Sequence, residues 1–153
     1  FGTMWSGSAN VKTGVIEYAD AGHNAPLLLR AGGKPEYLKK IPRGGLPLAV
    51  MEDGTYKRGT LTLGPGALLV VYTDGVTEAR NPEGGLYGDA RLVETMKNGG
   101  AMTTKETIDV VLADVRTYAR TAPQSDDITV LALRFSDATQ GPMTMMMPGI
   151  KLP

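Results

Sequence analysis

The stretch GALLVVYTDG, residues 66–75, constrains the fold of this chain more than any other part. Every side chain from Ala67 to Tyr72 is apolar or aromatic, and the stretch begins and ends with glycine. A continuous apolar run of this length, rich in branched residues, is typical of a strand that is covered on both faces. The stretch therefore predicts a central strand over 67–73 that ends at Asp74.

The rest of the chain alternates between strand and helix patterns. Mixed β-branched, aromatic and polar residues predict further strands. These lie at 14–20, 26–30, the second half of 55–63 and 126–135, with a brief strand near Tyr37 and Leu38. The expected order is several strands, then two helices, then a strand that returns to the sheet.

Two segments have the spacing of helices. Leu92, Val93 and Met96 share one face of a short helix over 88–100, which stops at a pair of glycines. A longer helix over 103–120 begins with Thr103 and Glu106 at the spacing of a capping box. Its apolar residues recur at helical intervals and predict one buried face.

The residues at both ends of the sequence indicate how the domain is bounded. Phe1 is not methionine, and the first residues already resemble the interior of a strand. We therefore expect a domain over 1–135 whose N-terminal part is missing from the given sequence. From Ser136 onward, three prolines, two glycines and a methionine cluster lack any regular period, which predicts a tail or linker over 136–153.

Composition excludes several classes of function. Sixteen basic residues balance sixteen acidic ones, so no net positive field favours a nucleic acid or an anionic membrane. The absence of cysteine excludes disulfides and thiolate metal sites. No apolar run is long enough to cross a bilayer, and we expect a cytoplasmic protein.

Acidic residues stand at the ends of two predicted strands. Asp74 leaves one strand, and Asp126 and Asp127 enter the last one. If these strands are antiparallel neighbours, their acidic ends meet. Two carboxylates about 5 Å apart repel by roughly 3 kcal/mol at an effective dielectric near 20. With no basic residue adjacent in sequence, a divalent cation with oxygen ligands is one counter-charge, and Gly75 would let backbone and solvent approach it closely.

A plainer interpretation of the same residues remains open. Asp-Gly after a strand is a common turn dipeptide, and Ser-Asp-Asp before a strand is also compatible with a hydrated loop. Spacing alone does not separate this interpretation from a metal site.

Several motifs in one order resemble a known family. They are YADAGHNAPLLL, GGLPLAV, LGPGALLVVYTDGVTEARN, GGLYGDARL and SDDITVLALRF. From Phe1 to Phe135 the chain resembles the C-terminal two thirds of bacterial metal-dependent protein serine/threonine phosphatases of the PPM family. The resemblance is to the branch that includes the stage II sporulation and stress-response sigma-regulator phosphatases.

The resemblance implies a fold, a metal centre and a reaction. The fold class is α+β, an antiparallel β-sandwich flanked by helices. Asp74 and Asp126 would be metal ligands, with Asp127 helping to hold water. In the family, two Mn²⁺ or Mg²⁺ ions bridge a water whose hydroxide attacks the phosphorus of phosphoserine or phosphothreonine, without a covalent enzyme intermediate. The expected partner is a phosphorylated protein, such as an anti-sigma-factor antagonist.

The chain also departs from the family pattern. The family's N-terminal Gly-Asp motif and a second acidic segment have no counterpart here, so this chain would carry half of the ligand set. The alternative is a catalytically incomplete module that binds a regulatory protein. Ala49 stands where the family usually has glycine, and Ala67 where an acidic residue is common.

Other polar residues have less defined roles. His23, the single histidine, lies in the AGHNAP turn and is expected to serve packing and hydrogen bonding rather than catalysis. Glu78 and Arg80 follow Asp74 closely and would contact either substrate or solvent.

Overall fold

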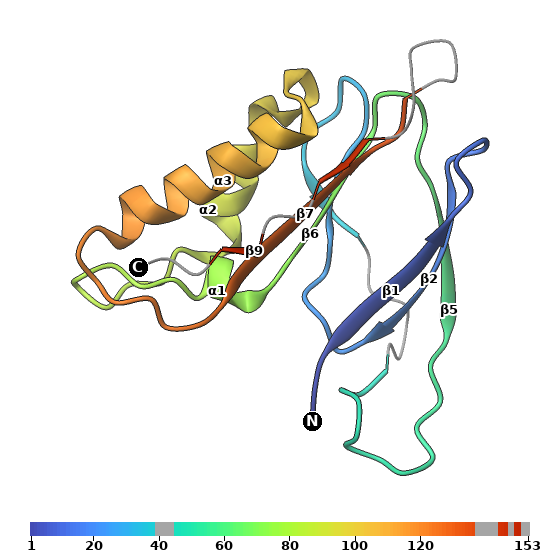
Figure 1. Ribbon diagram of the computed structural model, residues 1–153, viewed down its shortest axis with the longest axis horizontal. Coiled ribbons are helices and arrows are strands. Elements are labelled where there is room, and N and C mark those ends of the chain that lie inside the picture. Colours follow the sequence, from blue (N-terminus) through green and yellow to red (C-terminus); the bar gives the residue numbers. More distant parts are fainter. Residues whose placement is uncertain (39–44, 137–143, 147–148, 151–153) are drawn as a thin grey trace.

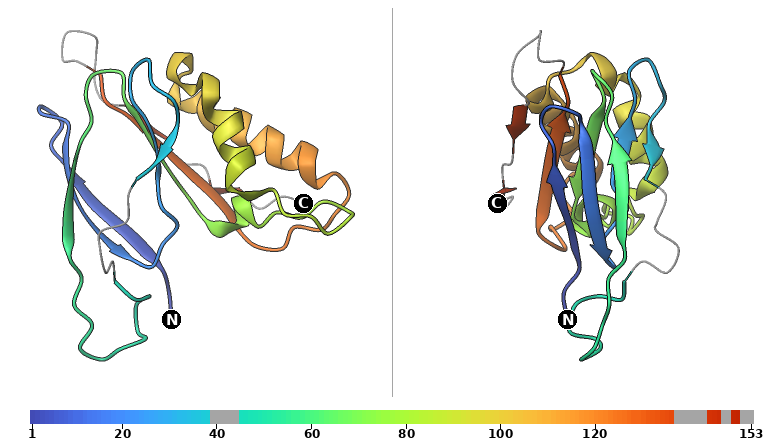
Figure 2. Two further views of the ribbon diagram at one scale, coloured as in Figure 1. Left: turned by 180° about the vertical axis from the view of Figure 1, so that it is seen from behind. Right: turned by 90° about the vertical axis from the view of Figure 1, so that its right-hand side faces the viewer.

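The computed structural model describes residues 1–38 and 45–136, together with the backbone of 144–146 and 149–150. Two antiparallel sheets pack face to face (Figure 1). The smaller sheet has the order β1-β2-β5, formed by Met4–Ala9, Val15–Ala21 and Arg58–Thr62. Seen from its own side, no helix among the described residues lies over this sheet (Figure 2, right).

The larger sheet holds the predicted central strand. Its order is β4-β3-β6-β7-β8, and β9 also pairs with β7. The strands are Leu27–Leu29 (β3), Glu36–Tyr37 (β4), Leu68–Tyr72 (β6), Ile128–Arg134 (β7), Thr144–Met146 (β8) and Gly149–Ile150 (β9). Strands β6 and β7 are antiparallel neighbours, with Tyr72 opposite Val130. The predicted return of the last strand to the sheet is confirmed.

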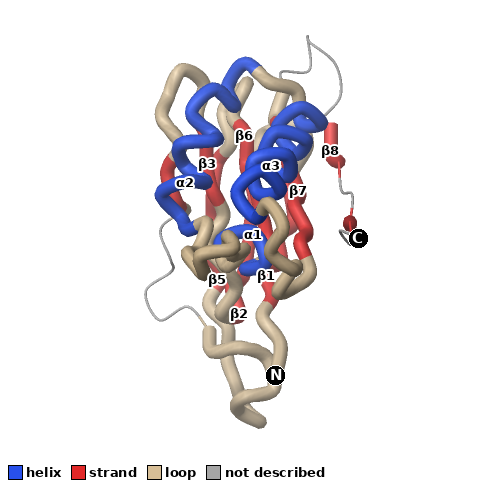
Figure 3. The backbone as a smooth tube through the Cα atoms, turned by 90° about the vertical axis from the view of Figure 1, so that its left-hand side faces the viewer, coloured by secondary structure: helices blue, strands red, loops and turns tan. Residues whose placement is uncertain are grey.

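Helices cover the outer face of the larger sheet (Figure 3). They are α1 (Asp74–Thr77), α2 (Gly88–Thr95), the 3₁₀ helix η1 (Met96–Ala101) and α3 (Thr104–Ala119). The capping box of α3 is confirmed, because Thr103 and Glu106 each bond the other's backbone N–H. The expected helix over 88–100 changes to 3₁₀ geometry at Met96, where glycine-rich sequence weakens the α-helix.

Strand β6 is covered on both faces, as its apolar run predicts. Leu68, Val70 and Tyr72 belong to the cluster beneath the helices. Leu69 is buried between the two sheets, and Val71 packs there as a partly buried residue. Period-two alternation along one strand therefore supplies side chains to both cores. The predicted antiparallel sandwich with flanking helices is confirmed.

A polar network holds α2 and α3 together. The Arg91 guanidinium donates to both oxygens of Asp114, at 2.9 and 2.7 Å. Tyr87 and Thr95 hydroxyls donate to Asp114 Oδ2, each at 2.8 Å. The hydrogen bond from Arg91, above all, lowers the pKa of Asp114 to about 2. The carboxylate therefore stays ionised and helps to hold α2 against α3.

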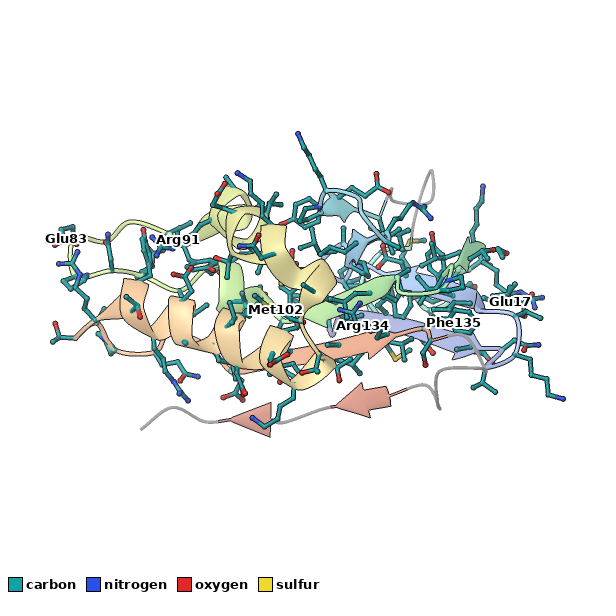
Figure 4. All side chains as sticks on the ribbon, turned by 90° about the horizontal axis from the view of Figure 1, so that it is seen from above. Glu17, Glu83, Arg91, Met102, Arg134 and Phe135 are labelled. Carbon is teal, nitrogen blue, oxygen red and sulfur yellow. The ribbon has the colours of Figure 1, made fainter. Side chains whose placement is uncertain are left out.

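The last residue of β7 anchors η1 to the sheet. Arg134 donates to the carbonyls of Gly66, Gly99 and Met102 at 2.7, 2.8 and 2.6 Å. Figure 4 shows the side chain of Arg134 directed toward Met102. Desolvation lowers the pKa of this guanidinium, which has carbonyl rather than carboxylate partners. One side chain thus fastens the η1 region to the sheet.

Two segments differ in structure from their sequence patterns. Asp74 is the first residue of the short helix α1 rather than the tip of a strand, and Thr73 precedes it with extended backbone. In 136–153, where no strand period is visible, the backbones of 144–146 and 149–150 pair with β7. The side chains of this stretch and its remaining residues, except Ser136, lie outside the described part of the chain. Within the part of the chain that is described, no helix combines the length and apolarity required to cross a membrane.

Candidate metal centre

The end of β6 is bonded directly to the start of β7. The Thr73 hydroxyl donates to the carbonyl of Asp127 at 2.8 Å and accepts from the Thr129 N–H at 2.9 Å. The backbone N–H of Thr73 donates to the Thr129 carbonyl at 3.1 Å. Three hydrogen bonds from one residue therefore fix the two acidic strand ends beside each other. The sequence interpretation did not single out this function of Thr73, because nothing in its local pattern marks it.

Gly75 allows the backbone of α1 to contact the entry of β7. A Cβ added at this residue would lie 2.5 Å from the Asp127 carbonyl oxygen and 3.2 Å from that of Asp126. Atoms other than hydrogen-bond partners do not approach this closely, so a side chain would force the two segments apart. Gly75 is itself buried. The structure thus gives a packing reason for this glycine, while its predicted role beside an ion stays a prediction.

The three acidic residues at this edge are solvent-exposed. Asp74, Asp126 and Asp127 form no salt bridge with any described residue. Asp126 Oδ1 accepts from the Asp127 N–H at 2.6 Å, and the Asp126 carbonyl accepts from the Gln124 amide at 2.7 Å. These bonds stabilise the loop before β7, and within the described ranges no cationic side chain lies within salt-bridge distance of the three carboxylates.

The donor set fits part of a site for a hard divalent cation. Carboxylate oxygens are the ligands that Mg²⁺ and Mn²⁺ prefer. In the described ranges, however, no three acidic, histidine or cysteine side chains are grouped closely enough to hold a metal ion. Asp74 and Asp126 would therefore supply two ligands, and the remaining coordination positions would need other donors.

His23 is distant in sequence from these carboxylates, and its described hydrogen bonds are to other residues. Its backbone N–H donates to Asp20 Oδ1 at 2.9 Å, and its Nδ1 lies 3.2 Å from the Thr3 hydroxyl. Asp20 is buried and also accepts the Gly45 N–H through its carbonyl. This arrangement stabilises a turn at the end of β2, and Asp20 is the partner that the sequence interpretation missed. The expected structural role of His23 stays a prediction.

Ala49 has a backbone conformation that favours glycine. Its φ is 63°, in the left-handed region where a Cβ is costly. The family resemblance implies glycine as the usual residue at this position, and the positive φ gives the physical reason for that preference. An alanine here stores strain of about 1 kcal/mol.

Comparison with known proteins identifies the family. The family model described as "Stage II sporulation protein E (SpoIIE)" matches residues 1–136, which is most of the chain. Protein IcfG from Synechocystis sp. is 32% identical over 133 residues, covering 87% of this chain and 20% of the relative. This chain therefore spans about a fifth of the length of that relative.

Solved structures share the fold. The phosphatase domain of the cell fate determinant SpoIIE from Bacillus subtilis superposes with a TM-score of 0.67 at 17% identity, covering 88% of this chain and 56% of that one. The RsbU and RsbW domain structure from Mycobacterium tuberculosis gives a TM-score of 0.64 at 28% identity, with 88% and 36% covered. The SiaA-PP2C domain of Pseudomonas aeruginosa gives 0.63 at 23% identity, with 80% and 47% covered.

The order of motifs, the helix-covered antiparallel sandwich and the match over residues 1–136 all agree. This chain belongs to the stage II sporulation protein E family of PP2C-type phosphatase domains.

Proposed function

We propose that this chain forms part of a metal-dependent phosphoserine/phosphothreonine protein phosphatase. The observation that supports the proposal most strongly is the meeting of two acidic strand ends. Thr73 bonds the backbone of Asp127 and Thr129, and Gly75 packs on the carbonyl of Asp127. Asp74 and Asp126 thus flank one short backbone junction, and no cationic side chain of the described residues forms a salt bridge with them.

The proposed role of this chain is to hold carboxylate groups in fixed positions around divalent cations. Asp74 and Asp126 would hold Mn²⁺ or Mg²⁺, and Asp127 would accept a hydrogen bond from water beside them. Divalent ions bound there supply Lewis acidity and lower the pKa of coordinated water. Thr73 and Gly75 keep the two carboxylate-bearing segments at a fixed separation, which is the preorganisation that electrostatic catalysis requires. Two ions are expected in a complete domain, with donors beyond those named here.

The proposed substrate is a phosphorylated protein that regulates sigma-factor activity, such as an anti-sigma-factor antagonist. This assignment rests on the resemblance to the stress-response branch and on the similarity to the Mycobacterium tuberculosis structure, in which an RsbU domain accompanies an RsbW domain. The site geometry itself supplies carboxylates for a cation, and the substrate class comes from the family.

A second function is favoured by a different observation. The described residues contain no group of three metal-ligating side chains, so this part of the chain by itself offers fewer ligands than a metal site needs. It would then act as a phosphatase-like module that binds a regulatory protein without hydrolysing it. The two functions differ in whether the chain takes up a divalent cation through Asp74 and Asp126.

Calorimetric titration of the chain with MnCl₂ separates these functions. We expect a saturable binding heat with a dissociation constant on the order of 10⁻⁴ to 10⁻³ M, as for weak carboxylate sites. Asp74→Asn and Asp126→Asn should each weaken binding at least tenfold, because each removes a charged ligand. Asp53→Asn is the matched control, since Asp53 is exposed and distant in sequence from the junction.

Binding heats that are the same in Asp74→Asn, Asp126→Asn and the unaltered chain would exclude the proposed ligands. A titration of the unaltered chain without any binding heat would favour the protein-binding module. Circular dichroism of each variant provides the folding control.

A further inference from the structure

A cleft of about 460 Å³ opens beside the junction described above. It lies between α1, the C-terminal turns of α3 and the loop that enters β7. Buried apolar side chains form its floor, namely Ala79, Val115 and Ile128. Gly75 and Ser125 also line it, and these residues directly precede or follow Asp74 and Asp126 in sequence. The cleft and the proposed metal edge are thus built from the same two segments.

The polar rim of the cleft is basic. Arg80, Arg116 and Arg120 line it, and among the described lining residues none is acidic. Arg120 pairs with Glu83 at 2.9 Å, whereas Arg80 donates to the carbonyl of Gly84 at 3.1 Å. In the described ranges no carboxylate lies within salt-bridge distance of Arg116 or Arg80. Two exposed guanidinium groups therefore face this cleft with their charge uncompensated.

The local charge contrasts with that of the whole chain. The sequence has equal numbers of basic and acidic residues, and its formal net charge is zero. The fold nevertheless gathers Arg80, Arg116 and Arg120 at this cleft, which has no acidic residue among its described lining residues. Three arginines along one cleft give a local positive field that attracts a carboxylate side chain.

The backbone at the rim is strained. Arg120 ends α3 with a φ of 49°, a left-handed conformation that helices normally assign to glycine. An arginine there costs about 1 kcal/mol relative to glycine. Glycine would relieve this strain but would remove the guanidinium from the rim. The retained arginine is therefore consistent with a function for its charge.

The cleft continues along the loop. A second hollow, of about 420 Å³, shares Arg80 and the residues 122–125 with the first. The two hollows therefore border one another on either side of Arg80. Together they offer room for several residues of an extended peptide rather than for one side chain.

We propose that this cleft binds an acidic side chain of the phosphoprotein substrate, close in sequence to its phosphorylated residue. The inference rests on the proposed phosphatase function, which places the phosphorylated residue of the substrate at the proposed metal edge. Arg116 is the principal contact, because its charge has no described partner, and its planar guanidinium suits bidentate pairing with a carboxylate. Apolar floor residues contact the aliphatic part of a bound glutamate.

The test uses binding rather than hydrolysis, so it does not depend on catalytic activity. Four fluorescein-labelled dodecapeptides are compared by anisotropy at low salt without metal. Two carry a central phosphoserine and two a central serine, and within each pair four flanking residues are all Glu or all Gln. We expect both Glu peptides to bind about tenfold more tightly than their Gln counterparts, as several exposed ion pairs would give.

The variant Arg116→Gln should reduce this preference for Glu about threefold to fivefold, as loss of one exposed ion pair predicts. Arg58→Gln is the matched control, because Arg58 is an exposed arginine in β5 of the other sheet, and it removes the same charge. It should leave the preference unchanged. Equal reductions in both variants would mean that only net charge matters, which overturns the inference.

Two other outcomes also overturn it. Equal affinities for Glu and Gln peptides in the unaltered chain would exclude a carboxylate site. An effect of Arg116→Gln confined to the phosphoserine peptides would assign the arginine to the phosphoryl group instead. Because the serine peptides and the metal titration are measured separately, failure of this inference is distinguishable from failure of the proposed function.

Discussion

The two sheets of this domain are covered to different extents. The larger sheet packs helices on one face and the smaller sheet on the other, so β6 has no solvent-exposed face. The smaller sheet has a single buried face, and Met4, Glu17 and Thr60 are exposed on its strands. Figures 1 and 2 show the contrast, with helices on one side only among the described residues.

This contrast explains where the acidic junction is located. Strands β6 and β7 are held from both faces, so the residues at their ends have little freedom to shift. A site that must keep carboxylates at a fixed separation needs such support. Rigidity and candidate chemistry therefore coincide in the helix-covered sheet.

Truncation of a core side chain should lower the free energy of unfolding more in the larger sheet than in the smaller one. Leu68→Ala removes a fully buried side chain beneath the helices and should lower the free energy of unfolding by about 3–5 kcal/mol. Leu61→Ala, on β5 of the smaller sheet, should cost about 2 kcal/mol, because an edge strand can collapse into the space. Urea unfolding measures both. Equal losses would contradict the contrast between the sheets.

An added methyl group at the junction should have the next largest effect. Gly75→Ala should lower the free energy of unfolding by about 1–3 kcal/mol, because its Cβ would overlap the Asp127 carbonyl. Gly64→Ala is the control, since nothing lies within 4 Å of a Cβ there. Thermal unfolding should separate the two variants. A Gly75→Ala protein as stable as Gly64→Ala would show that α1 and β7 are not tightly packed.

The smallest expected effect is a pH dependence in the helical layer. The pKa of Asp114 is about 2 in the folded protein against 3.8 for an ordinary aspartate. A lowered pKa contributes stability above pH 4 that is lost as the pH falls toward 2. The contribution is about 1–2 kcal/mol after allowance for solvent screening.

The measurement is the difference in free energy of unfolding between the unaltered chain and Asp114→Asn. It should decrease as the pH falls from 4 to 2. Thr117→Ala, which alters an exposed side chain on the same helix that carries no charge, serves as the control and should give a nearly constant difference. A constant difference for Asp114→Asn as well would contradict the role assigned to the network.

Local sequence patterns predicted most of the elements. The apolar run of β6, the capping box of α3 and the return of β7 follow from periodicity and turn residues. The pairing of β6 with β7 needed one further assumption, that consecutive strands around two helices are neighbours. These features depend on the interval at which apolar side chains recur along the chain, and that interval can be read from a sequence.

Other features depend on contacts between distant residues and had no local signal. Thr73 bonds Thr129, Gly75 packs on Asp127, and Arg134 spans carbonyls on two segments. The helix at Asp74 was also missed, because its four residues have the composition of a turn. Such features are set by which backbones the fold brings together.

The sequence by itself determined most of the strands, the two longer helical segments, the family resemblance and the three acidic residues near the ends of β6 and β7. Its balanced charge gave no indication of a basic cleft. Only the tertiary structure decided that Arg80, Arg116 and Arg120 share one cleft beside those carboxylates. The physical reason is that periodicity acts between near neighbours along the chain, whereas electrostatic fields sum over charges that folding has brought close in space.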